Sequence, residues 1–76
     1  MKTVMIRLST IADVRDFVNI VSGTDVDVDL VSGRYVVDGK SIMGIFSLDL
    51  SKPIDLNIHA EENVDEVLAI LAPYTI

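Results

Sequence analysis

The chain alternates between two spacings of apolar residues, and the changes in spacing divide it into short elements. A period of two, typical of half-buried strands, covers Thr3–Leu8, Asp25–Leu30 and Ile54–Ala60. A fourth short segment, Arg34–Val37, is predicted to return from a turn as the hairpin partner of the second strand. Each of these strands has one polar face, which favours an antiparallel sheet with one face open to solvent.

The first predicted helix starts at Ile11, where apolar residues begin to recur at helical spacing. Thr10 and Asp13 are placed to form a capping box at its start, and Gly23 is expected to end it. The expected buried face consists of Ile11, Val14, Phe17, Val18 and Val21.

Two shorter helices complete the predicted fold. One starts at Ser41, and the last runs from about Asn63 to Ala72, with Asn63 and Glu66 expected to form a cap pair. The predicted order is therefore β-α-β-β-α-β-α. This is an α+β fold, an open-faced β-sandwich in which three helices cover one face of a four-stranded antiparallel sheet. The chain has 76 residues and no linker, repeat or low-complexity segment, so the pattern predicts a single domain, 1–76.

The composition and net charge of the chain exclude or disfavour several kinds of binding site. Half of the residues are hydrophobic, which suits a compact fold, and there is no cysteine for a disulfide or a thiolate metal site. His59 is the single histidine, so zinc ligation by several histidines is excluded, and no metal or cofactor is expected. A net charge of −6 without a basic cluster disfavours binding to nucleic acid or to an anionic membrane. No apolar run approaches the roughly 18 residues of a membrane span, and the polar positions in MKTVMIRLST argue against a signal peptide, so the expected compartment is the cytoplasm.

Three groups of polar residues are candidate sites. Asp25, Asp27 and Asp29 have the every-second-residue spacing of calcium ligands, but the interleaved Val residues predict a solvated strand face instead. His59 lies within a strand and is predicted to be a solvated surface histidine, because no converging partners are evident for phosphate or metal. Thr10 has no histidine base nearby, so a helix cap is favoured over a nucleophile. No catalytic residue is predicted.

The segment Lys40–Leu50, KSIMGIFSLDL, combines a capping hydroxyl with a run of large apolar residues. Ser41 is a good N-cap, because its side-chain oxygen can accept a hydrogen bond from a free amide one turn in. A helix of less than two turns cannot bury apolar side chains on all sides, so an exposed docking surface beside Ser41 is expected. The alternative is a short core helix with a good cap. The apolar residues in question are Ile42, Met43, Ile45 and Phe46.

The sequence KSIMGIFSL resembles the regulatory-serine segment of HPr, the small phosphocarrier of the bacterial sugar phosphotransferase system. The resemblance extends from Thr3 to Leu71, and Val14–Leu48 aligns without gaps. It implies the HPr fold, a bacterial cytoplasmic protein and protein partners. In an HPr phosphocarrier, a histidine just after the first strand accepts a phosphoryl group and passes it on. That site also needs free amides at a helix start and an arginine close by.

The resemblance also implies that the phosphocarrier site is degenerate in this chain. Continuing the alignment back from Ser41 places Thr10 at the position of the histidine, Ala12 at that of the arginine and Asp13 at that of the following proline. A phosphothreonine ester is too stable for reversible transfer, and the Asp13 carboxylate would repel a phosphoryl group at the helix start. The expected protein is therefore a divergent HPr family member that is neither an enzyme nor a phosphohistidine carrier.

The resemblance assigns a regulatory role to Ser41. In typical Gram-positive HPr proteins, and in a paralogue without the active histidine, a dedicated kinase phosphorylates this serine, and the product docks on a transcriptional regulator of carbon use. Ile42, Met43 and Phe46 match the apolar docking patch of the family, and Phe46 replaces the usual methionine, a difference that could affect partner choice. The expected function is thus that of a regulatory or adaptor protein. Its expected partners are HPr kinase, a transcriptional regulator or phosphotransferase-system components.

Two alternatives remain open from the sequence. The first is a phosphotransferase-system phosphocarrier component that uses an unconventional acceptor, His59 or Thr10. The second is a degenerate domain with a structural role, for example a homodimer paired through its strands.

Overall fold

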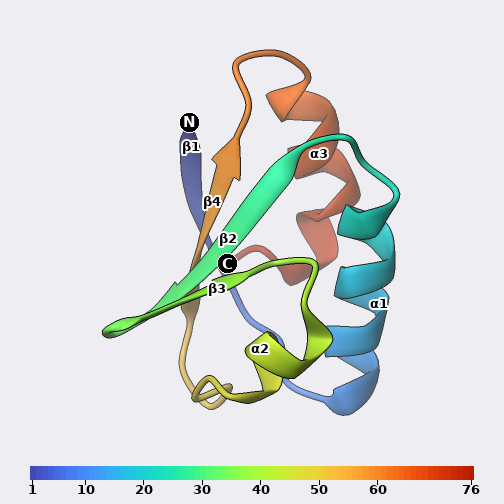
Figure 1. The fold of residues 1–76 in the computed structure, drawn as a ribbon. Coiled ribbons are helices and arrows are strands. Elements are labelled where there is room, and N and C mark those ends of the chain that lie inside the picture. The colour runs from blue at the N-terminus through green and yellow to red at the C-terminus, as the bar shows by residue number, and fades with distance from the viewer.

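The computed structural model describes residues 1–76 as a four-stranded antiparallel sheet with the helices on one face (Figure 1). The strand order is β1-β4-β2-β3, so β1 and β3 form the two edges. The predicted α+β class and the order β-α-β-β-α-β-α are confirmed. The elements are β1 (Lys2–Ile6), α1 (Ile11–Ser22), β2 (Asp27–Ser32), β3 (Tyr35–Asp38), α2 (Ile42–Phe46), β4 (Ile54–His59), α3 (Val64–Ile70) and a short 3-10 helix, η1 (Ala72–Tyr74).

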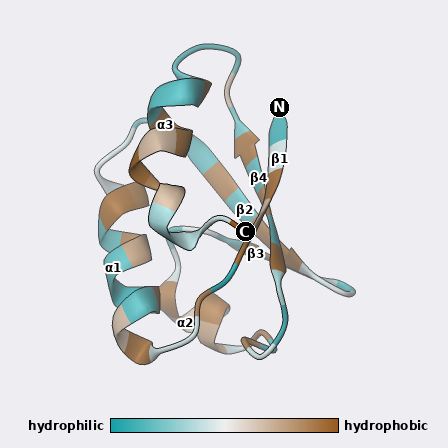
Figure 2. Ribbon diagram, turned by 180° about the vertical axis from the view of Figure 1, so that it is seen from behind, coloured by the Kyte–Doolittle hydropathy of each residue, from teal (hydrophilic) through white to brown (hydrophobic).

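The hydrophobic core lies between the sheet and the helices. Alternate residues of the strands point toward it, and Figure 2 shows the resulting change between hydrophobic and hydrophilic positions along β2 and β4. The innermost side chains of the sheet are Val28 and Leu30 of β2 and Ile54, Leu56 and Ile58 of β4. Val14, Phe17 and Val21 cover them from α1 and are fully buried, as the helical spacing predicts.

The start of α1 confirms the predicted capping box but corrects the predicted buried face. Thr10 Oγ1 accepts a hydrogen bond from the Asp13 amide at 3.0 Å, and Asp13 Oδ2 accepts one from the Thr10 amide at 3.2 Å. Gly23 is the C-terminal cap, as predicted. Ile11, however, is 74% exposed, so its assignment to the core is wrong. A side chain at the first helical position points back past the helix start, where no sheet residue lies to cover it.

The last helix also differs from the prediction at both ends. It spans Val64–Ile70, and the expected cap pair of Asn63 and Glu66 does not form, because the Asn63 side chain makes no capping hydrogen bond. Asn63 has a φ of 62°, in the left-handed region that asparagine tolerates better than most residues. The chain therefore enters α3 through a backbone turn rather than through a side-chain cap.

The C-terminal residues close onto the first strand, which the sequence did not predict. The Tyr74 carbonyl accepts a hydrogen bond from the Arg7 amide at 2.8 Å, just beyond the end of β1. The Tyr74 ring packs edge-on against Phe17, with ring centres 6.0 Å apart. Burial, together with the negative charge of Asp16, raises the pKa of Tyr74. The tail thereby adds an aromatic contact to the core beneath α1.

Two glycines position β3 against β2, one before the strand and one after it. Gly33 has a φ of 60° in the two-residue turn that joins β2 to β3, a conformation that favours glycine. The Gly39 amide donates a hydrogen bond to the Val28 carbonyl at 2.8 Å. A β-carbon on Gly39 would lie only 2.4 Å from Val28 Cγ2, so this close approach requires glycine.

None of the helices has the length and apolar character that a membrane-spanning helix requires.

Candidate functional site

The apolar residues of α2 divide between the core and the surface. Ile45 is fully buried, whereas Met43 is 77% exposed, Phe46 40% and Ile42 36%. A helix of five residues makes little more than one turn, so only one side of it can face the sheet. The exposure expected from the shortness of this helix is therefore confirmed, and the alternative of a core helix is wrong for three of its four large apolar residues. We refer to Ile42, Met43 and Phe46 as the α2 surface.

Ser41 is the N-cap of α2, as predicted. Its Oγ accepts a hydrogen bond from the Gly44 amide at 3.2 Å, and its carbonyl accepts one from the Ile45 amide at 3.1 Å. A β-carbon on Gly44 would lie 3.2 Å from both Ser41 Oγ and Val37 Cβ, so glycine lets the helix rest directly on β3. The hydroxyl is half-buried and sits at the edge of the α2 surface.

The start of α1 lies at the same end of the molecule as α2. Figures 1 and 2 both show α2 beside the N-terminal part of α1, and the two helices are in contact. Ile11, the first residue of α1, is therefore an exposed apolar side chain near the α2 surface. Its place on this surface could not be expected from the sequence, because its helical spacing assigns it to the core.

Two amides just before α1, those of Ser9 and Thr10, are paired with a carboxylate of this chain. Asp13 Oδ2 accepts hydrogen bonds from the Ser9 amide at 3.0 Å and from the Thr10 amide at 3.2 Å. Arg15, the one basic residue of α1, lies 3.6 Å from Asp16 and is not part of this cap. A phosphoryl group at Thr10 would have to displace a negative charge to reach these donors. The capping box therefore places a carboxylate beside the helix start, where it would repel a bound anion.

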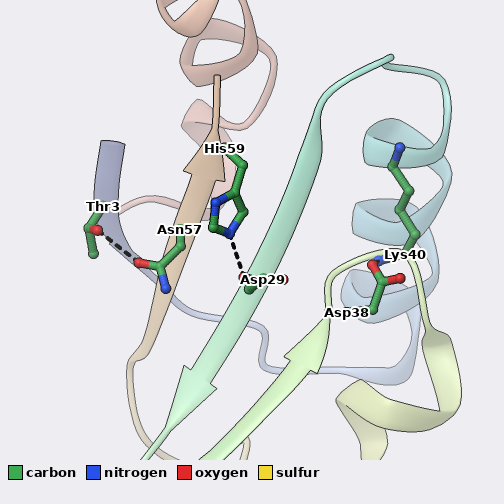
Figure 3. Close-up of polar contacts among 6 residues, drawn as sticks. All are labelled: Thr3, Asp29, Asp38, Lys40, Asn57 and His59. Carbon is green, nitrogen blue, oxygen red and sulfur yellow. Dashed lines mark hydrogen bonds and ion pairs between the residues drawn. The ribbon is translucent and has the colours of Figure 1, made fainter. Parts of the chain in front are cut away.

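His59 lies on the open face of the sheet and bridges two strands (Figure 3). Its Nε2 is 2.5 Å from Asp29 Oδ2, and Asp27 is its register partner across the β2–β4 pair. Neighbouring Asn57 accepts a hydrogen bond from Thr3 Oγ1 at 2.8 Å through its own Oδ1. His59 is a partly exposed surface histidine, as predicted. Its pairing with Asp29 of the neighbouring strand β2 is not evident from the sequence.

The open face of the sheet is acidic around His59. No group of three histidine, aspartate or glutamate side chains has the geometry to hold a metal ion. The strand register instead spreads the carboxylates across three strands, which fits a solvated sheet face. The carboxylates of this face are Asp27, Asp29, Asp38 and Asp55.

The loop that follows α2 is stabilised by its own polar residues. Asp49 Oδ1 accepts hydrogen bonds from both the amide and the hydroxyl of Ser51. These two bonds, with a contribution from the charge of Lys52, lower the pKa of Asp49. The loop carries no further candidate site residue.

Two solved structures resemble this fold over nearly its whole length. HPr-C-His from Thermoanaerobacter tengcongensis superposes with a TM-score of 0.80 at 25% sequence identity, covering 96% of this chain and 89% of that one. The phosphocarrier protein HPr from Bacillus anthracis str. Ames superposes with a TM-score of 0.70 at 26% identity, covering 99% and 94%. The chain has the HPr fold, and the likeness supports its resemblance to the HPr family. No family profile and no curated protein sequence matches it.

In this HPr-like protein the predicted site residues fall into two separate places. Ser41, the α2 surface and Thr10 lie at one end, where α2 contacts α1. His59 is the last residue of β4, which ends near the opposite end of the sheet (Figure 1). The structure therefore does not bring the two unconventional acceptor candidates, Thr10 and His59, together.

Proposed function

We propose that this HPr-like protein is a regulatory or adaptor module that binds partner proteins through the α2 surface, under the control of Ser41 phosphorylation. The supporting observation is the exposure of Ile42, Met43 and Phe46 on a single turn of helix that Ser41 caps. It acts by docking rather than by catalysis, and it does not relay phosphate through a histidine.

The composition of the α2 surface supports a role in binding. Methionine and phenylalanine are enriched at protein interfaces, and α2 itself carries no charged residue that would have to be desolvated on docking. Burial of apolar area contributes about 25 cal/mol per Å², so one turn of helix with three apolar side chains can provide the centre of a small interface. Ile11 extends the apolar surface toward α1.

The surroundings of Ser41 are compatible with a phosphate. The modification would add a charge of about −1.5 to −2 and strong acceptor oxygens at the edge of the α2 surface. The first turn of α2 contains no acidic residue, in contrast to α1 with Asp13. Lys40 precedes Ser41 in the chain, but its Nζ donates to the Thr24 carbonyl at 3.2 Å and so points to the loop after α1 (Figure 3). A partner with an arginine could then recognise the phosphate and the apolar side chains together.

Incubation with HPr kinase and ATP should add one phosphate, located at Ser41 by intact-mass measurement and peptide mapping. Ser41→Ala should abolish the mass shift and cost about 1 kcal/mol of stability through loss of the cap. Ser47→Ala, at the other end of α2, is the matched control and should be phosphorylated like the wild type. An unmodified wild-type protein, in a reaction that modifies a known HPr substrate, would contradict the proposal.

The second candidate function, phosphocarrying through His59, has one observation in its favour. With Nε2 directed at Asp29, the other ring nitrogen, Nδ1, is left as the potential nucleophile. The surrounding carboxylates oppose it, because they would repel both the donor and the transferred phosphoryl group.

We therefore expect no label on the protein after incubation with phosphoenolpyruvate and the first enzyme of the phosphotransferase system. A typical HPr, labelled in the same reaction, is the positive control. An acid-labile phosphate on His59, or a stable phosphate on Thr10, would show that the unconventional acceptor operates and that the adaptor proposal is incomplete.

A further inference from the structure

Strand β3 is an open edge of the sheet that carries exposed apolar residues. No strand lies beyond it, and its residues Tyr35 and Val36 are 67% and 64% exposed. Natural edge strands are commonly protected by shortness, charge, proline or a bulge; β3, the segment YVVD, has no proline, and its protection is limited to its length of four residues and the charge of Asp38. The edge is therefore available for pairing with another strand.

The backbone groups on this free edge can be assigned from the ladder with β2. The Gly39 amide bonds to the Val28 carbonyl, and in an antiparallel pair alternate residues bond to the same neighbour. Val37 and Tyr35 accordingly bond to β2, whereas Val36 and Asp38 direct their amides away from it. Two amides spaced for a second antiparallel strand thus point into solvent.

The charges that flank β3 are arranged symmetrically. Arg34 precedes the strand and Asp38 ends it, with Val36 midway between them. Arg34 forms no ion pair within the chain. One oxygen of Asp38, Oδ1, accepts from the Lys40 amide at 2.9 Å, which leaves Oδ2 free. A strand with opposite charges at its two ends is complementary to an antiparallel copy of itself.

We propose that β3 pairs antiparallel with β3 of a second copy of this chain, about a two-fold axis that passes between the two Val36 residues. The Val36 backbones exchange two hydrogen bonds, and each Asp38 amide donates to the Arg34 carbonyl of the other copy. Each Arg34 side chain then lies across from Asp38 of its partner. The two sheets become one continuous sheet with a shared open face.

Charge also selects this register over its neighbour. A shift of two residues keeps the same backbone groups facing each other but moves Arg34 from opposite Asp38 to opposite Lys40. Like charges directly opposite are unfavourable, and the shift in the other direction places Arg34 opposite Val36 and loses both ion pairs, so the register centred on Val36 is the favoured one. Since β3 has only four residues, the pairing is weak and its extent depends on protein concentration.

Sedimentation equilibrium over a series of protein concentrations at about 0.15 M salt tests this pairing. The wild type should show a monomer–dimer equilibrium. Val36→Pro removes an amide that makes no bond to β2, so the variant should remain folded by circular dichroism. It should sediment as a monomer. Arg34→Glu, which places like charges opposite each other, should raise the dimer dissociation constant at least tenfold. Arg15→Glu makes the same charge change on α1 and should leave that constant unchanged.

Three results would overturn the inference. The first is a wild type that stays monomeric up to millimolar concentration. The second is a dimer that persists in folded Val36→Pro, which would place the interface elsewhere. The third is growth beyond the dimer, which would indicate head-to-tail pairing of β3 with the other edge strand, β1.

Discussion

Replacement of Met43 by glutamate should slow the phosphorylation of Ser41 by HPr kinase at least tenfold, measured as kcat/KM. The kinase must contact the helix that Ser41 caps, and a charge at the most exposed position of the α2 surface would be buried there without a partner. A tenfold change corresponds to about 1.4 kcal/mol, which is modest for the centre of an interface. The free energy of unfolding should change by no more than about 0.5 kcal/mol, because the residue is exposed.

The matched control is Ile70→Glu, which makes a similar apolar-to-acidic change at an exposed helical position on α3. It should be phosphorylated at the wild-type rate. Equal slowing of both variants would indicate a general effect of charge, and no slowing of either would mean that the kinase does not use the α2 surface.

Phe17→Ala should have a much larger effect on stability, lowering the free energy of unfolding by about 3–5 kcal/mol in urea titrations. Phe17 is fully buried and supports the Tyr74 ring of the C-terminal tail, so its removal leaves a cavity and weakens the closure of the chain. Ile11→Ala, at the position that helical spacing assigns to the same core, should change stability by no more than about 0.5 kcal/mol. A loss of several kcal/mol at Ile11 would contradict the placement of its side chain in solvent.

The sequence predicts most of the sheet and of α1 because the spacing of apolar residues there records burial directly. Strand alternation identifies Leu30 and Leu56 as inward-facing, and the short-range contact of Thr10 with Asp13 depends only on local geometry. The predicted burial of Ile11 is wrong because the period of the apolar residues identifies a helix face but not the point along the helix where the sheet ends. The predicted side-chain cap at Asn63 is wrong because a residue with a left-handed backbone can precede a helix without making the cap that asparagine commonly makes.

The candidate site was predictable where it rests on local structure and unpredictable where it rests on strand register. The exposure of the α2 surface follows from the shortness of the helix, which is visible in the sequence. The pairing of His59 with Asp29 requires β4 to lie beside β2 in one particular register, and no local pattern contains that information. The closure of the tail on Arg7 is likewise a long-range contact.

The two helix starts at one end of the molecule differ in a way that bears on function. At α1, the Asp13 carboxylate accepts from the Ser9 and Thr10 amides and places a negative charge beside the helix start. At α2, the cap is a neutral hydroxyl without an acid in the first turn. The fold of a phosphocarrier is thus combined with an acidic cap at the start of α1 and an exposed apolar helix beside it.

Mapping the binding surface by nuclear magnetic resonance tests the central proposal most directly. The isotopically labelled protein would be titrated with HPr kinase, and the perturbed backbone amides assigned. We predict that the perturbations concentrate on Ile42, Met43 and Phe46 and extend to the start of α1, while His59 and the open face of the sheet stay unchanged. Perturbations confined to the open face, or the absence of any in the presence of an active kinase, would contradict docking through the α2 surface.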